Sequence, residues 1–106
     1  MILSEITSYF KSLVPLALQE NYDNSGLLIG LEETEISGAL ICLDVTSDIL
    51  DEAIEKKCNL VISHHPLIFS GLKSITGRSE TERLVMRAIQ ENIAIYALHT
   101  NLDNHN

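Results

Sequence analysis

Three short, uninterrupted apolar runs constrain the fold of this sequence more than any other feature. They occupy residues 39–43, 60–62 and 93–98. Each run is too short for a buried helix and has the pattern of a strand covered on both faces, as in a parallel sheet. Helical patterns separate the runs. The order strand, helix, strand, helix, strand predicts two consecutive βαβ units with right-handed crossovers.

Three segments carry apolar residues at helical spacing. The first covers residues 4–14, the second follows Ser47 as its expected N-cap, and the third follows a capping-box pattern formed by Ser79 and Glu82. The apolar stripes that we expect to face the core are Ile6, Tyr9, Phe10, Leu13 and Val14; Ile49, Leu50, Ala53 and Ile54; and Leu84, Val85, Ala88 and Ile89.

The chain fits one α/β domain over residues 1–106. This length is enough for a single core and too short for two. A turn at residues 21–26 precedes a further short strand at residues 27–30. The predicted architecture is a βαβαβ unit whose largely parallel sheet is flanked by helices.

The charge of the chain excludes several classes of partner. Fifteen Asp and Glu against seven Lys and Arg give a formal net charge of -8, and the basic residues form no stripe. We therefore expect neither nucleic acid nor a membrane as a partner. The sequence shows no leader pattern and no apolar run of transmembrane length. Cys42 and Cys58 do not form a C-x-x-C motif, so we expect reduced, buried thiols in a cytoplasmic protein.

All four histidines follow predicted strands. His64 and His65 come directly after the second apolar run, His99 comes after the third, and His105 lies further on. The carboxyl ends of parallel strands meet at the edge where α/β sheets bind ligands. The adjacent His64 and His65 leave the strand in different directions, so they could serve two metal ions, or one ion and one substrate. With Asp103, this set of imidazoles and a carboxylate suits Zn, Mn, Fe, Ni or Co.

Other interpretations of these residues remain open. His64 and His65 could instead bond to loop backbone at the end of their strand. Asp44 ends the first run at the same edge, where it is a ligand, a partner of a ligand or, as we favour, the cap of the next helix. Asp23 could orient a ligand, but an Asx turn with Gly26 in a left-handed conformation explains this segment better.

Three motifs follow one another along the chain. They are Tyr22-Asp23-Asn24-Ser25-Gly26-Leu27, Ser63-His64-His65-Pro66-Leu67-Ile68-Phe69 and Tyr96-Ala97-Leu98-His99-Thr100-Asn101-Leu102-Asp103. In this order and at this separation they resemble the Nif-three-like family, many members of which are labelled GTP cyclohydrolase 1 type 2 homologs. The resemblance spans nearly all 106 residues, with Tyr22 where the family usually has Trp.

The resemblance implies a dinuclear metal centre between two α/β halves, with two divalent ions per site in the intact family. It places metal ligands on His64, His65 and Asp103. His99 lies close by and is the candidate catalytic residue, as a general acid/base or a further ligand. The family's remaining ligands, a His and a Glu four apart near the end of a longer chain, have no match here. The chain therefore looks like the amino-terminal portion of a family member.

The resemblance also implies a function. Paired ions would activate water and polarise a substrate, as in two-metal hydrolases, and the family label implies a purine nucleotide such as GTP or another small substrate. A homo-oligomer, in the form of a toroidal hexamer, is implied as well. The alternative is a non-catalytic metal-binding regulatory or scaffold protein. The lack of a P-loop, a nucleophile elbow and a basic nucleotide-binding patch mildly favours that alternative or a small, poorly charged substrate.

Overall fold

The computed structural model of the chain describes residues 1–13, 26–67 and 74–98. Every predicted helix and strand is present, with bounds shifted by a residue or so. The elements are α1 (Leu3–Leu13), β1 (Gly26–Ile29), β2 (Ala39–Cys42), α2 (Ser47–Glu55), β3 (Leu60–Ser63), α3 (Glu80–Gln90) and β4 (Ala94–Ala97).

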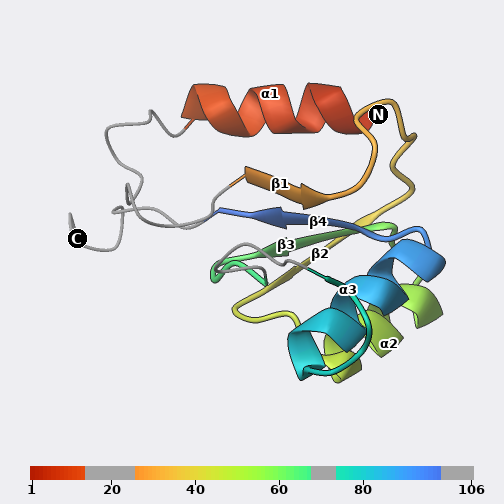
Figure 1. Cartoon of the computed structure of the whole chain (residues 1–106). Coiled ribbons are helices and arrows are strands. Elements are labelled where there is room, and N and C mark those ends of the chain that lie inside the picture. The colour runs from red at the N-terminus through yellow and green to blue at the C-terminus, as the bar shows by residue number, and fades with distance from the viewer. Residues whose placement is uncertain (14–25, 68–73, 99–106) are drawn as a thin grey trace.

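The strands form one sheet in the order β1-β4-β3-β2, with helices on both faces (Figure 1). β2, β3 and β4 run parallel, and β1 pairs antiparallel with β4. α2 and α3 lie together on one face and α1 lies on the other (Figure 1). Both crossover helices share a face, as two crossovers of one hand require when strands are added in one direction. The predicted α/β architecture is confirmed.

Apolar side chains fill the space between the sheet and the helices on each face. β3 and β4, the two central strands, are buried along their whole length. On one face, α2, α3 and the sheet share a core whose main buried residues are Leu50, Ala53, Val61, Leu84, Val85, Ala88 and Ile95. On the other face, α1 and the sheet share a core of Leu3, Leu60, Ile62, Ala94 and Tyr96, against which the half-buried Ile6 and Phe10 pack.

β2 contradicts the prediction that every apolar run is covered on both faces. Ile41 is 78% exposed, and Leu43, just after the strand, is 67% exposed. β2 lies at the edge of the sheet, and among the described residues the cluster beneath α1 takes side chains from β1, β3 and β4 but not from β2. One helix does not reach across the whole sheet, so part of β2 stays open.

The buried stripes of α2 and α3 are narrower than predicted. Ile54 is 39% exposed and Ile89 is 54% exposed, although both were expected in the core. Each residue follows the first member of its stripe by five positions, which places it about 140° around the helix. A helix that lies on a flat sheet buries a narrower arc than this, so the last member of each stripe reaches the surface.

α2 begins one residue earlier than its predicted cap. Thr46, not Ser47, is the N-cap, because its hydroxyl oxygen accepts the N–H of Ile49 at 3.2 Å. At the other end Lys56 is the C-cap and Lys57 has a φ of 59°, so the helix ends before both lysines. The chain therefore turns sharply into β3.

α3 begins at its predicted cap, with a variation. Ser79 Oγ accepts the N–H of Glu82 at 3.2 Å, which confirms the N-cap. The Glu82 carboxylate reaches further back than a standard capping box, since it accepts the N–H of Thr76 at 2.9 Å. Glu82 thereby fastens the segment before α3 to the first turn of the helix.

Cys42 and Cys58 are both free thiols, half-buried against the core, in line with their expected packing role. No helix within the described ranges is long and apolar enough to cross a membrane.

Candidate functional site

His64 and His65 follow β3 directly and are hydrogen-bonded to the end of β2. The His64 N–H donates to the Cys42 carbonyl at 3.0 Å, and the His65 N–H donates to the Leu43 carbonyl at 2.9 Å. These bonds hold the backbone of both histidines against the end of β2, in a bend at the carboxyl edge of the parallel strands. This is the edge at which the sequence predicted the site.

Ser63 fixes the bend that contains the histidines. Its side chain is almost completely buried, and its hydroxyl donates to the His65 carbonyl at 2.8 Å. The Ser63 carbonyl in turn accepts the N–H of Leu98 at 2.8 Å, which ties the end of β4 to the end of β3. β4 therefore ends next to the residue that precedes the histidine pair.

The two imidazole rings lie close to each other. The ring centroids of His64 and His65 are 4.9 Å apart, with an angle of 59° between the ring planes. We expected the two side chains to leave the strand in different directions. The ring planes are indeed tilted against each other, but the rings stay close together. The two imidazoles are therefore neighbours at this edge of the sheet.

Asp44 is the partner of His65. Nδ1 of His65 and Oδ1 of Asp44 lie 2.8 Å apart, and both side chains are largely exposed. A carboxylate only accepts hydrogen bonds, so Nδ1 of His65 is the donor of this pair. The helix cap that we favoured for Asp44 is wrong, because Thr46 occupies that position.

The sequence contained a signal for this pair in the register of the sheet. β2 and β3 pair in parallel from Ala39 with Leu60 to Cys42 with Ser63. Continuing the same register by two residues places Asp44 beside His65. Sequence reasoning could list both residues at one edge, but the register between strands was needed to match them.

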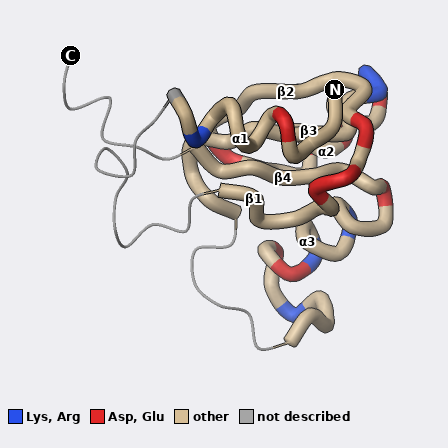
Figure 2. Tube along the Cα trace, turned by 90° about the horizontal axis from the view of Figure 1, so that it is seen from above, with Lys and Arg blue, Asp and Glu red and all other residues tan. Residues whose placement is uncertain are grey.

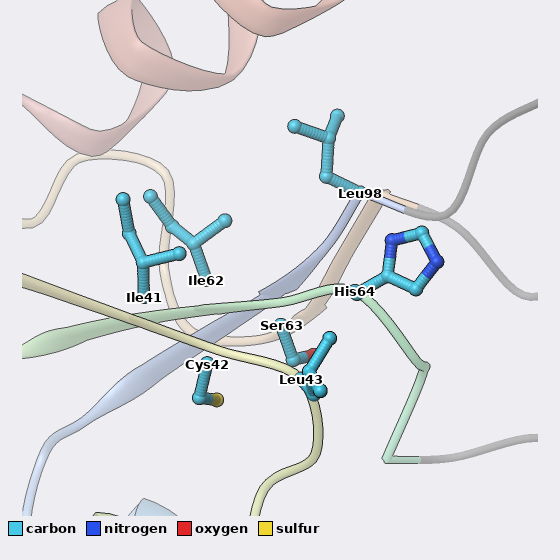
Figure 3. A pocket seen from close by; sticks show the side chains of 7 residues that line it. All are labelled: Ile41, Cys42, Leu43, Ile62, Ser63, His64 and Leu98. Carbon is cyan, nitrogen blue, oxygen red and sulfur yellow. The ribbon is translucent and has the colours of Figure 1, made fainter. Parts of the chain in front are cut away.

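A pocket of about 490 Å³ borders His64 (Figure 3). Its lining residues are Ile41, Cys42, Leu43, Ile62, Ser63, His64 and Leu98. Ile41, Ile62 and Leu98 project to the same side of the sheet as the His64 imidazole, whereas Cys42 and Ser63 project to the other side (Figure 3). The sequence analysis missed Ile41 as a lining residue, because its exposure depends on β2 being an edge strand.

Cys42 is a thiol in this pocket and not a thiolate. Burial, and then the negative charge of Asp44, raise the pKa of the Cys42 thiol above its ordinary value of 9.0. Nucleophilic and metal-ligating cysteines need the opposite shift. Among the described residues at this edge, the imidazoles therefore suit metal binding better than the Cys42 thiol does.

Basic side chains are dispersed over the described part of the chain (Figure 2). Lys56 pairs with Glu52 at 2.8 Å, and Arg87 of α3 pairs with Asp51 of α2. Among the described residues, those that line the pocket include neither Lys nor Arg.

Several candidate residues lie outside the described residues. They are His99, Asp103 and His105, together with the segment from Tyr22 to Ser25 that includes Asp23. Within the described ranges, no three His, Cys, Asp or Glu side chains form a group that could hold a metal ion. The described structure thus pairs His65 with Asp44 and places the rings of His64 and His65 close together, without gathering three ligands at one point. The predicted ligand Asp103 stays a prediction.

Comparison with known proteins identifies relatives over the full length of the chain. The family model described as Duf34/NIF3 (NGG1p interacting factor 3) matches residues 1–106. A GTP cyclohydrolase 1 type 2 homolog of Staphylococcus epidermidis is 44% identical over 103 residues, which are 97% of this chain and 28% of that protein. The homolog of Clostridium acetobutylicum is 36% identical over 102 residues, covering 96% of this chain and 38% of the relative.

A solved structure shares the fold. The crystal structure of Staphylococcus aureus protein SA1388 superimposes with a TM-score of 0.90 at 42% identity, over 97% of this chain and 29% of that one. The chain thus spans well under half the length of the relatives that it matches. The similarity confirms the resemblance and the fold, and it leaves the activity of the whole protein as a matter for proposal.

Proposed function

The chain belongs to the Duf34/NIF3 family, and from that premise we propose that it binds divalent metal at the carboxyl edge of β3 and β2, as part of a metal-dependent hydrolase. The single observation that carries this proposal is the hydrogen bond between Nδ1 of His65 and Asp44. Metal-binding histidines nearly always donate their second ring nitrogen to a carboxylate or carbonyl, which fixes the tautomer and aims the other nitrogen at the ion.

The described residues fit such an ion in their chemistry. His64 and His65 offer two imidazole nitrogens from rings 4.9 Å apart, and imidazole suits Zn, Mn, Fe, Ni and Co. We propose His64, His65 and Asp103 as ligands, with Asp44 as the group that orients His65. A bound pair of divalent ions would supply Lewis acidity toward water and substrate.

The roles of the protein groups follow from their ordinary chemistry. Asp44 holds the proton of His65 at Nδ1, and Ser63 holds the backbone turn that carries both imidazoles. His99, two residues after β4, is proposed as the general acid/base, because an imidazole exchanges protons near neutral pH. The name of the curated relatives suggests GTP as substrate, and we propose more broadly a nucleotide-like or other small molecule hydrolysed in a cytoplasmic homo-oligomer, such as a toroidal hexamer.

Titration calorimetry with Zn²⁺ and Mn²⁺ on the full chain tests metal binding. The variants His64→Ala and His65→Ala should each lower affinity by roughly 10- to 100-fold. Glu91→Ala is the control, because Glu91 is an exposed residue at the end of α3, before the amino end of β4 and so at the opposite edge of the sheet. Both test residues follow β3 at the surface edge, so circular dichroism should show the same fold in all variants. Equal metal affinity in the wild type and both test variants would contradict the proposed site.

Activity assays separate the two functions that the sequence left open. The metal-loaded chain is incubated with nucleotides and phosphoesters, and product is measured with and without a chelator. Turnover that the chelator abolishes supports a hydrolase. Metal uptake without turnover of any substrate, also in a chain of the relatives' length, would favour the non-catalytic regulatory or scaffold protein.

A further inference from the structure

A buried hydroxyl lies directly before the histidine pair. Ser63 is almost completely buried, and among the described residues it is one of two buried polar side chains, the other being Thr7. As the last residue of β3, Ser63 pairs with Cys42 of β2 on one side and with Ala97 of β4 on the other. The sheet therefore holds Ser63 from both sides, at the point where the chain leaves β3.

The hydroxyl of Ser63 acts on the backbone of His65. It donates to the His65 carbonyl at 2.8 Å, across the bend that contains both histidines. The Ser63 side chain projects to the side of the sheet opposite the His64 imidazole (Figure 3). The hydroxyl thus reaches forward from a fixed strand end to the second histidine of the pair.

The backbone of His65 is held at both of its polar groups. Its N–H donates to the Leu43 carbonyl at 2.9 Å, and its carbonyl accepts the Ser63 hydroxyl. Pro66 follows, and a proline ring disfavours the helical conformation in the residue before it. These constraints limit the direction in which the His65 side chain leaves the backbone. The imidazole then meets Asp44, with 2.8 Å between Nδ1 and Oδ1.

The Ser63 hydrogen bond is shielded from water, whereas the Asp44 hydrogen bond is not. Both side chains of the pair formed by Asp44 and His65 are largely exposed, so water competes for their hydrogen bond. The buried Ser63 hydroxyl has no such exchange with solvent, and leaving it without a partner costs free energy. The buried bond therefore maintains the bend on which the exposed pair depends.

We infer that Ser63 is a positioning residue of the candidate site, because its buried hydroxyl holds the bend in which His65 meets Asp44. The inference deepens the proposed function, and it rests on that function for the effect on metal affinity alone. A hydroxyl with a merely structural role would stabilise the fold without affecting the His65 ring. Removal of the hydroxyl therefore gives different results for the two roles.

Ser63→Ala in the full chain removes the hydroxyl and adds no atom to the core, so the variant should fold. In the metal-free protein, the NMR shifts of the two His65 ring nitrogens show which of them carries the proton of the neutral imidazole. Nδ1 should carry it in the wild type. In Ser63→Ala a measurable share of the proton should move to Nε2, because the ring is directed less firmly toward Asp44. The affinity for Zn²⁺, measured by calorimetry, should fall by roughly tenfold.

Thr7→Val is the matched control for this experiment. Thr7 is also buried, and its hydroxyl also donates to a nearby backbone carbonyl, that of Ser4, at 3.1 Å. Both variants lose a buried hydroxyl, so both should lower the melting temperature. Only Ser63→Ala should change the position of the His65 proton and the affinity for Zn²⁺.

The outcomes distinguish this inference from the proposed function. A lower melting temperature in Ser63→Ala, with the His65 proton and the Zn²⁺ affinity unchanged, would overturn the inference even when the histidine variants support the metal site. Equal changes at His65 in Ser63→Ala and Thr7→Val would overturn it as well. A shift of the His65 proton in Ser63→Ala alone, in a chain whose wild type binds no Zn²⁺, would support the role of Ser63 and contradict the proposed function.

Discussion

The carboxylate of Asp44 lies 2.8 Å from Nδ1 of His65, although 21 residues separate the two along the chain. The parallel register between β2 and β3 places them side by side just after both strands end. Neither side chain contributes to the core, and both are largely exposed. A hydrogen bond between two exposed groups adds little to the free energy of unfolding. The main effect of this pair is therefore to orient the His65 imidazole.

Asp44→Asn should therefore affect metal binding more than folding. The amide can no longer hold His65 as a carboxylate does, and we expect metal affinity to fall by roughly 10- to 100-fold. The free energy of unfolding should change by less than about 0.5 kcal/mol, as is usual for surface substitutions. Calorimetry with Zn²⁺ and urea denaturation measure the two effects. Asp48→Asn, at an exposed carboxylate in the first turn of α2, is the matched control.

Much of the fold was predictable because local patterns set it. The runs in β3 and β4 are buried along their whole length, and the stripe from Leu84 to Ala88 packs on the sheet as its spacing indicated. Strand order was not predictable from local pattern. It depends on which strands pair across the crossovers, and it decides that Ile41 is exposed while Ile62, of similar sequence context, is buried.

The candidate site was predictable in its position but not in its contacts. The place of His64 and His65 follows from the rule that parallel strands direct their carboxyl ends to one edge. The contact of Asp44 with His65 could be predicted only with the register between β2 and β3 known. It also depended on Thr46, and not Asp44, being the N-cap of α2. Thr46 and Ser47 have the same capping chemistry, so one residue of difference in the helix start lay beyond the sequence pattern.

Thr46→Ala should destabilise the protein by about 1 kcal/mol, because it removes the side-chain acceptor for the Ile49 N–H at the start of α2. Ser47→Ala should cost less, since Ser47 lies inside the helix and its hydroxyl accepts a hydrogen bond from Arg87 instead of capping a backbone N–H. Urea denaturation of both variants measures the difference. A larger loss for Ser47→Ala would mean that the helix begins at the cap predicted from sequence.

Gly30→Ala should destabilise the protein by roughly 1–3 kcal/mol through steric overlap and backbone strain. Gly30 has a φ of 129°, and a Cβ at this position would lie 2.8 Å from the Cβ of Ala94. Gly26→Ala is the matched control, because Gly26 also has a positive φ, of 107°, but no heavy atom within 4 Å of the added Cβ. Thermal denaturation should show the greater loss for Gly30→Ala. Equal losses would attribute the whole effect to the backbone conformation.

Stability should decrease at acidic pH in a way that depends on Glu82. The N–H of Thr76 lowers the pKa of the Glu82 carboxyl below its ordinary value of 4.5, and the N–H of Arg78 and the hydroxyls of Thr76 and Ser79 act in the same direction. A carboxyl whose pKa is lower in the folded state stabilises that state fully above the unfolded pKa. This contribution is lost as the pH falls from about 4.5 through the folded pKa.

Glu82→Gln tests this linkage directly, because the amide still accepts hydrogen bonds but does not titrate. The variant should be less stable than the wild type at pH 7, and the difference should shrink as the pH is lowered below 4.5. Urea denaturation at a series of pH values measures it, with Glu80→Gln in the same helical turn as the control. A stability difference between wild type and Glu82→Gln that stays constant from pH 7 to pH 3 would show that the carboxylate charge does not hold the segment before α3.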